Sequence, residues 1–197
     1  MSLDSIINEL GLPIGLPVEN WQAREAPPST SMQGRFCTLV PTDVEAHGMA
    51  LYEAFAKDTD HSNWTYLPYG PFATAAEFVA WLSQVSAGQD PLFHTVLNGD
   101  RVPVGLTTYL RVDPGPGVIE VGHIHFSPLM QRTPMATEAM YLMMKRVFDE
   151  LAYRRYEWKC NALNAPSRAA AERLGFSFEG VFRQAAVVKG HNRDTAW

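Results

Sequence analysis

The pattern of apolar and polar residues divides the chain into an irregular start and a regular body. Residues 11–34 are rich in Pro and Gly and show no sustained period, which is typical of an arm laid over the body. From Gly34 onward, strand-like and helix-like runs follow one another. The expected organisation is therefore an N-terminal arm, residues 1–33, and one domain, residues 34–197. Because the chain stops at Trp197, within or just after a predicted strand, we also expect a truncated C-terminus.

Apolar residues spaced three and four apart predict four helices. The first opens at Pro41-Thr-Asp43, and the second begins near Thr74. The long helix 134–151 carries an apolar, Met-rich stripe of the kind that faces a core. A short helix over residues 166–174 is closed by Gly175, which suits the left-handed position after a helix.

The remaining apolar runs predict strands. Residues 91–97 and 102–112 should pair antiparallel around Asn98-Gly99, a strong hairpin signal. Strand 118–126, helix 134–151 and strand 155–163 form a β-α-β unit, so these two strands should be parallel. Further strands are expected at 35–40, 176–188 and 193–197. The predicted class is α+β, with a mixed, mostly antiparallel sheet, a central parallel strand pair and flanking helices.

Composition excludes several classes of protein. With 16 Lys+Arg against 21 Asp+Glu, the net charge of −5 argues against a non-specific binder of nucleic acid or anionic membrane. No apolar run approaches the roughly 20 residues that span a bilayer, and the start lacks a signal-peptide pattern. We therefore expect a cytoplasmic protein. Cys37 and Cys160 lie in strand-like segments and are expected to be buried free thiols.

The start of helix 134–151 is a candidate anion site. Thr133 suits the N-cap and Pro134 the first helical position. A helix that follows a strand in a β-α-β unit presents unpaired N–H groups and a positive dipole end. From these residues alone, an ordinary well-formed helix start is an equally good interpretation.

Three segments in order carry a family resemblance. They are Gly34-Arg-Phe-Cys-Thr-Leu-Val-Pro41, Thr137-Glu-Ala139, and Asn164 followed by Leu174-Gly-Phe176. From about Gly34 to Trp197 the chain resembles the GNAT N-acetyltransferase superfamily, in the branch of the ribosomal-protein N-terminal (alanine/serine) acetyltransferases. The resemblance implies that acetyl-coenzyme A binds where strands 118–126 and 155–163 splay apart.

The resemblance also implies a set of coenzyme-binding residues. The pantetheine arm would pair with strand 118–126, where the N–H of Ile124 or His125 polarises the thioester carbonyl, and the pyrophosphate would lie at the start of helix 134–151. The residues implied are Ile124, Phe126, Gln131, Arg132, Thr133, Met135, Ala136, Thr137 and Asn164.

The phosphate loop departs from the family pattern Gln/Arg-x-x-Gly-x-Gly/Ala. Arg132 stands at the first glycine and Pro134 at the second. Pro134 removes a backbone donor, and the Arg132 side chain limits close approach of a phosphate. The Arg132 cation and the Thr133 hydroxyl would supply part of the phosphate contacts that are lost in this way. A lowered affinity for the coenzyme is expected.

The resemblance implies two catalytic residues. Glu120 matches the carboxylate that many members use as a base, directly or through water, although it could instead pair with an arginine at the strand edge. Ala171 stands at the usual tyrosine position, so Ser167 would protonate the departing thiolate. Ser167 and Asn164 could equally be capping residues.

Strand alternation places Glu120, Gly122, Ile124 and Phe126 on one face, and Val121, His123 and His125 on the other. A His-x-His strand can hold a metal, but no further ligands at matching spacing are evident. We expect His123 and His125 to line the acceptor pocket or the core, and we expect no metal.

The amine acceptor is the part of the reaction that the sequence specifies least. Residues 64–72 lie where this branch builds its acceptor wall, but they could also be a packed loop or a dimer contact. The expected activity is acetyl transfer from acetyl-coenzyme A to a primary amine, on a protein N-terminus or a small molecule, by direct attack in a ternary complex. The alternatives are a non-catalytic acyl-coenzyme A-binding module and a metal-binding α+β domain. The chain is compatible with a homodimer, and we expect no nucleic-acid or membrane partner.

Overall fold

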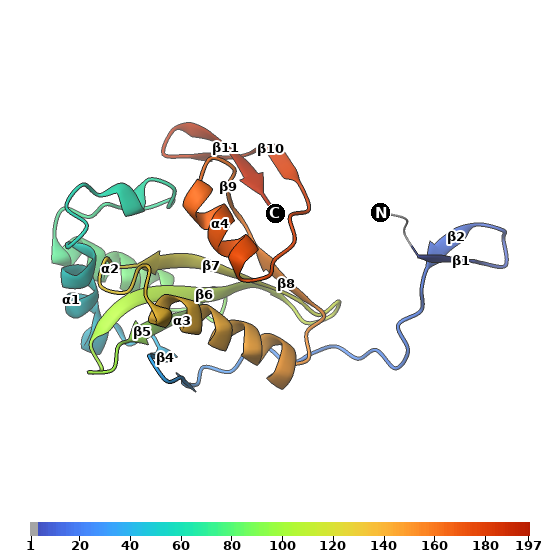
Figure 1. The fold of residues 1–197 in the computed structure, drawn as a ribbon, viewed down its shortest axis with the longest axis horizontal. Helices are drawn as coiled ribbons and strands as arrows, with labels where there is room; N and C mark the ends of the chain where they lie inside the picture. The colour runs from blue at the N-terminus through green and yellow to red at the C-terminus, as the bar shows by residue number, and fades with distance from the viewer. Residues whose placement is uncertain (1–3) are drawn as a thin grey trace.

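A six-stranded sheet forms the centre of the computed structural model, which describes residues 4–197 (Figure 1). Its strands run in the order β3-β4-β5-β6-β7-β8. Their bounds are β3 Met32–Gln33, β4 Thr38–Pro41, β5 Leu92–Leu97, β6 Pro103–Asp113, β7 Val118–Phe126 and β8 Arg155–Trp158. Every neighbouring pair is antiparallel except β7 and β8, which are parallel. The predicted mixed α+β class is confirmed.

Helices pack on both faces of this sheet. The first face carries α1 (Val44–Phe55), the short η1 (Ser62–Trp64) and α2 (Ala75–Val85) around one aromatic core cluster. The second face carries α3 (Pro134–Lys145), whose Met-rich stripe is buried as predicted. Beyond Lys145 the helix continues as a π-helical turn, η2 (Arg146–Glu150). No helix within residues 4–197 has the length and apolar character needed to cross a membrane.

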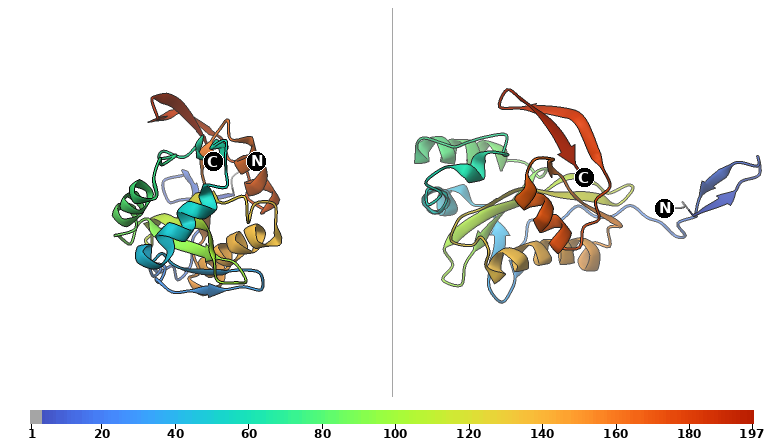
Figure 2. Two further views of the ribbon diagram at one scale, coloured as in Figure 1. Left: turned by 90° about the vertical axis from the view of Figure 1, so that its left-hand side faces the viewer. Right: turned by 45° about the horizontal axis from the view of Figure 1, so that its top comes forward.

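The chain leaves the main sheet after β8. A second sheet, in the order β10-β11-β9, is built from β9 (Cys160–Asn161), β10 (Val181–Val188) and β11 (His191–Ala196), with α4 (Ala165–Arg173) inserted after β9. The C-terminal hairpin stands above the main sheet in the right-hand view of Figure 2. The prediction of one strand over 155–163 is therefore wrong, because pairing passes from β7 to β11 at Lys159. The strand predicted to start at 176 begins only at Val181.

The N-terminal segment has two parts. Residues 21–33 lie on the body, where the Trp21 Nε1 donates to the Gly115 carbonyl at 2.8 Å and Arg146 donates to the carbonyls of Thr30 and Ser31. Strands β1 (Ser5–Ile7) and β2 (Pro13–Gly15), which were not predicted, pair only with each other and stand away from the body (Figure 1). The interpretation of residues 11–34 as an arm laid over the body is thus wrong for residues 11–20.

A bulge in β7 reverses the faces of its last residues. Thr108 pairs with Gly122 but Leu106 pairs with His125, so three steps along β7 match two along β6. His123 takes up the extra residue in the left-handed conformation, with φ of 47°. As a result Ile124 and Phe126 pack against the α3 side, whereas His125 lies on the α1/α2 side with Glu120. The predicted alternation is wrong beyond Gly122.

Both cysteines are buried and unbridged, as predicted. Cys160 lies in β9 and Cys37 directly precedes β4. Burial, with the nearby Glu138 carboxylate, raises the pKa of the Cys37 thiol to about 12. Neither thiol is placed for reactivity at neutral pH.

Glu138, from the Thr137-Glu-Ala139 signature, fastens the segment before β4 to α3. Its carboxylate accepts the backbone N–H groups of Arg35, Phe36 and Cys37 at 2.8, 2.6 and 2.9 Å. Desolvation raises the pKa of this carboxyl, but the three N–H donors outweigh it and the net shift is downward. A side chain on Gly34 would collide with the same carboxylate. The glutamate of this signature therefore has a structural role.

Replacing Glu138 by Gln should lower the free energy of unfolding by about 1–3 kcal/mol, because charged acceptors of backbone N–H groups would be lost. The stability difference should be full above about pH 4.3 and shrink as the pH falls through the lowered pKa. Urea unfolding measures both. Glu53→Gln, an exposed site on α1, is the matched control and should be neutral. Equal stability of Glu138→Gln and wild type would contradict this role.

Candidate active site

A cavity of about 200 Å³ opens where β7 and β8 part. The last pair that joins them is Val121 and Trp158, after which β7 runs on to Phe126 paired with β6 but not with β8. The cavity is lined from β7, from the β8–β9 junction, from the start of α4 and from the loop after η1. It brings together four predicted site residues, which are Glu120, Ile124, Asn164 and Ser167. Phe126 and the residues of the predicted phosphate loop do not line it.

Glu120 is buried in this cavity, with 3% of its surface exposed, and is held by two cations. The Arg111 Nη1 lies 2.6 Å from Oε1, and the Lys159 Nζ lies 2.7 Å from Oε2. Lys159 also pairs with Glu157 at 2.8 Å. These two partners offset part of the cost of burying a charged side chain. Pairing with an arginine is confirmed, and the role of Glu120 as a base stays a prediction.

Asn164 and Ser167 form a hydrogen-bonded unit at the start of α4. The Asn164 Oδ1 accepts the backbone N–H of Ser167 at 3.1 Å, so its capping role is confirmed. The Ser167 Oγ accepts the indole N–H of Trp158 at 3.0 Å. Accepting this bond leaves the hydroxyl proton of Ser167 free and makes the hydroxyl a better donor.

The two histidines of β7 have different surroundings. His123 lines the cavity, and its Nδ1 lies 3.0 Å from the Tyr69 hydroxyl. His125 is buried in the core, stacked on Phe55 at 3.9 Å and edge-on to Trp64. Burial, together with Arg111, lowers the pKa of His123 to about 4, and burial lowers that of His125 to about 3. The positions of His123 at the cavity and His125 in the core agree with the prediction that they line a pocket or the core.

The described part of the chain, residues 4–197, contains no group of three or more His, Cys, Asp or Glu residues close enough together to hold a metal ion.

Arg132, just before the start of α3, stands where the family pattern has a glycine, and its backbone has a conformation that glycine favours. Arg132 has φ of 60°, in the left-handed region that glycine adopts easily, and its side chain is exposed. Thr133 is the N-cap residue as predicted, but its hydroxyl donates to the Met130 carbonyl at 2.7 Å instead of capping the helix. The Gln131 side chain donates to Asn63 and to the Phe126 carbonyl, which ties the loop to the end of β7.

Several backbone donors of this loop are already engaged. The N–H groups of Gln131, Thr133 and Ala136 donate to carbonyls within residues 127–133. The N–H groups of Arg132 and Met135 have no acceptor within residues 4–197. Two unpaired donors at a helix N-terminus, beside an exposed guanidinium, fit an anionic group such as a pyrophosphate.

The predicted acceptor wall is divided between cavity and core. Tyr66, Leu67 and Pro68 line the cavity, and the Tyr66 hydroxyl donates to the Leu163 carbonyl at 3.1 Å. Trp64 and Phe72 instead belong to the aromatic cluster under α1 and α2. The loop thus closes the cavity while its aromatic base is anchored in the core.

Sequence reasoning missed three cations that line the cavity, namely Arg111, Lys159 and Arg193. For Lys159 a signal was present. An acidic residue inside the apolar run 118–126 needs a buried cation, and Lys159 is the lysine inside the partner strand of the same β-α-β unit. Arg111 and Arg193 reach the cavity through strand register, which the sequence does not reveal.

These features define a class of protein. A parallel strand pair that parts above a cavity, together with a helix start that has two unpaired N–H groups, is an arrangement that accommodates an acyl thioester with a pyrophosphate. The residues present therefore fit an acyl-coenzyme A-dependent transferase.

The comparison with known proteins gives the family. The model of the acetyltransferase (GNAT) domain matches residues 37–177, and the chain belongs to this family. No curated protein matches the chain. As a GNAT acetyltransferase it uses acetyl-coenzyme A as acetyl donor.

Solved structures agree with this assignment. A GCN5-related N-acetyltransferase from Brucella melitensis is 47% identical with a TM-score of 0.89, over 91% of this chain and 82% of that one. A probable GNAT-family acetyltransferase from Chromobacterium violaceum ATCC 12472 is 42% identical with a TM-score of 0.86, over 94% of this chain and 92% of that one. The microcin C7 self-immunity acetyltransferase MccE, solved with acetyl-coenzyme A and AMP, shares the fold at 18% identity and a TM-score of 0.71, over 83% and 91% of the two chains.

The buried histidines predict a dependence of stability on pH. The unfolded chain protonates His125 below about pH 6.5, whereas the folded chain does so only near pH 3, so stability falls as the pH drops through this window. His125→Phe keeps the ring against Phe55 and removes the titration. The loss of unfolding free energy between about pH 7 and about pH 5 should be smaller in this variant by about 2 kcal/mol.

Urea unfolding at the two pH values checks this expectation. His191→Gln, at an exposed position of β11, is the control and should keep the wild-type dependence. An unchanged pH dependence in His125→Phe would show that His125 is not held neutral by its surroundings.

Proposed function

We propose that the protein transfers the acetyl group of acetyl-coenzyme A to a primary amine, on a protein N-terminus or a small molecule, by direct attack in a ternary complex. The observation that carries this proposal is the cavity at the β7–β8 gap, which gathers Glu120, Ile124 and Ser167 around one space. Acetyl-coenzyme A supplies the activated thioester, and the chain supplies the groups that move protons and stabilise charge.

Glu120 is the proposed proton acceptor for the amine, directly or through water. Its carboxylate lies in the cavity, where Arg111 and Lys159 hold it in position. The cavity is lined by three cations, one carboxylate and a neutral histidine, which favours the uncharged amine over the ammonium ion. An uncharged amine is the form that can attack.

The backbone N–H of Ile124 is the proposed stabiliser of the developing oxyanion. Within residues 4–197, Ile124 has no partner residue in the register of β6, and pairing with β8 ends at Val121. Its N–H is therefore not committed to a strand ladder. Such a preorganised donor is the usual way to stabilise an oxyanion.

Ser167 is the proposed acid for the departing thiolate. As the N–C bond forms and the C–S bond breaks, the hydroxyl proton of Ser167 passes to sulfur, and the hydroxyl is restored by the proton that the amine released. The Trp158 indole, which donates to the Ser167 Oγ, orients the hydroxyl and stabilises the oxygen while it is deprotonated.

Ser167→Ala should lower kcat for acetyl transfer by about 100-fold while the Kd for coenzyme A changes by less than about twofold. Release of free thiol, followed over a panel of amines and N-terminal peptides, measures the rate, and calorimetry measures binding. Ser177→Ala, an exposed serine beyond α4, is the matched control and should keep full activity. Wild-type turnover in Ser167→Ala would remove Ser167 from the mechanism, and binding without turnover of any amine would overturn the proposed function.

A further inference from the structure

Arg193 is a cation of the candidate active site that has no carboxylate partner. It lines the β7–β8 cavity together with Glu120 and Ser167, and its side chain is half-buried. Among residues 4–197, no Asp or Glu forms an ion pair with its guanidinium. Its Nε is shielded from solvent and finds no hydrogen-bond acceptor in the same part of the chain. A buried donor without an acceptor is costly, so it indicates a ligand that supplies one.

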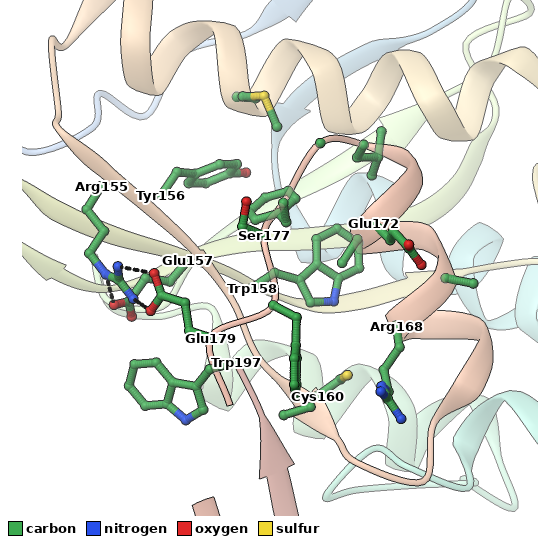
Figure 3. A pocket seen from close by; sticks show the side chains of 18 of the residues that line it. Arg155, Tyr156, Glu157, Trp158, Cys160, Arg168, Glu172, Ser177, Glu179 and Trp197 are labelled. Atoms are coloured by element: carbon green, nitrogen blue, oxygen red, sulfur yellow. Dashed lines mark hydrogen bonds and ion pairs between the residues drawn. The ribbon is translucent and has the colours of Figure 1, made fainter. Parts of the chain in front are cut away.

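The other charges at this cavity neutralise one another. Ion pairs join six side chains into one chain of alternating cations and carboxylates, namely Arg111, Glu120, Lys159, Glu157, Arg155 and Glu179. Figure 3 shows the end of this chain, where Arg155 lies between Glu157 and Glu179. His123 also lines the cavity and is neutral, because burial and Arg111 lower its pKa to about 4. The charge of Arg193 is therefore left uncompensated.

Strand pairing fixes Arg193 at the cavity. It lies in β11, which pairs antiparallel with β9, and the Asp194 carbonyl accepts the N–H of Ala162 at 2.8 Å. The neighbouring Asp194 carboxylate is engaged elsewhere, since it accepts the backbone N–H of Gln184 at 2.7 Å and the Asn192 side-chain amide at 2.9 Å. Arg193 is thus a preorganised cation, held by a sheet and without competition from the adjacent acid.

The volume of the cavity limits what can reach this cation. About 200 Å³ is available, which is less than the roughly 300–1,000 Å³ of pockets that enclose a drug-sized ligand. The acetyl group takes part of this space in the proposed reaction. An anionic group that reaches Arg193 therefore belongs to a small acceptor, in which it lies close to the amine.

We propose that the acceptor is a small primary amine that also carries a carboxylate, and that Arg193 binds this carboxylate while the amine lies beside Glu120. This inference rests on the proposed acetyl transfer and specifies its acceptor. A guanidinium binds a carboxylate through two parallel hydrogen bonds, which would give Nε its missing acceptor and compensate the unbalanced charge. A peptide N-terminus lacks this group, because the carboxyl of its first residue is part of an amide bond.

Matched acceptors test the role of the carboxylate. The probes are the proteinogenic amino acids, their carboxamides, and peptides that begin with the same residues. Release of thiol from acetyl-coenzyme A gives kcat/KM for each probe, calculated per uncharged amine because a carboxamide lowers the pKa of the amine beside it. At least one amino acid should exceed its carboxamide and the corresponding peptide by about 10- to 100-fold.

Substitution of Arg193 tests the site itself. Arg193→Gln should raise KM for the preferred amino acid by about 10- to 100-fold and change KM for its carboxamide by less than about twofold. Arg193→Lys keeps the charge and should retain part of the preference. Arg183→Gln, at an exposed position of β10, is the matched control and should behave as wild type. An unchanged Kd for coenzyme A, measured by calorimetry, shows that each variant is folded.

The outcomes separate this inference from the proposed function. Equal use of amino acids, carboxamides and peptides, or an equal loss for acid and carboxamide in Arg193→Gln, would overturn the inference while acetyl transfer stands. If no probe is acetylated, the proposed function fails. The carboxylate site then stands only if calorimetry shows an amino acid binding to the coenzyme A-loaded wild type and not to Arg193→Gln, and absence of that binding overturns it.

Discussion

The parting of β7 from β8 is the constraint on which the rest of the structure depends. The two strands pair in parallel for four residue pairs and then separate at Val121 and Trp158. Beyond this point the chain continues as β9, whose Cys160 and Asn161 pair with β11, while the bulge at His123 turns the end of β7. The bulge leaves the backbone of Ile124 outside the ladders, and the separation creates the cavity. A polar gap inside a sheet is costly unless its backbone groups gain partners, so it indicates function.

A chain of charges holds the parted strands in place. Glu120 of β7 is joined through Lys159 to Glu157 of β8, which is joined to Arg155 and from there to Glu179. Desolvation raises the pKa of Glu157, but hydrogen bonds from Lys159 and Arg155 lower it more. The Lys159 ammonium also lies 3.7 Å from the Trp197 ring. The same residues therefore stabilise the gap and set its charge, which links the architecture to the chemistry proposed for it.

The sequence predicted those features that depend on local pattern. Three such features follow from residues that lie within a few positions of one another. They are the helix start at Thr133-Pro134, the hairpin around Asn98-Gly99 and the burial of the Met-rich face of α3. The bulge at His123 does not, because a period of two carries no mark of an inserted residue. The break at Lys159 was missed for a related reason, since residues 155–163 are strand-like throughout and only the choice of partner strand changes. The left-handed backbone of Arg132 was not predicted, because arginine does not favour this conformation and its place at a family glycine was interpreted only through its side chain.

Hydrogen exchange with and without acetyl-coenzyme A tests the central claim most directly, namely that the parted strands and the start of α3 hold the coenzyme. Mass spectrometry of the full chain should show slower exchange of backbone N–H groups in residues 122–126 and 131–137 when the coenzyme binds, and no change in residues 118–121, which are already paired with β8. Binding that protects neither segment 122–126 nor segment 131–137 would contradict the account.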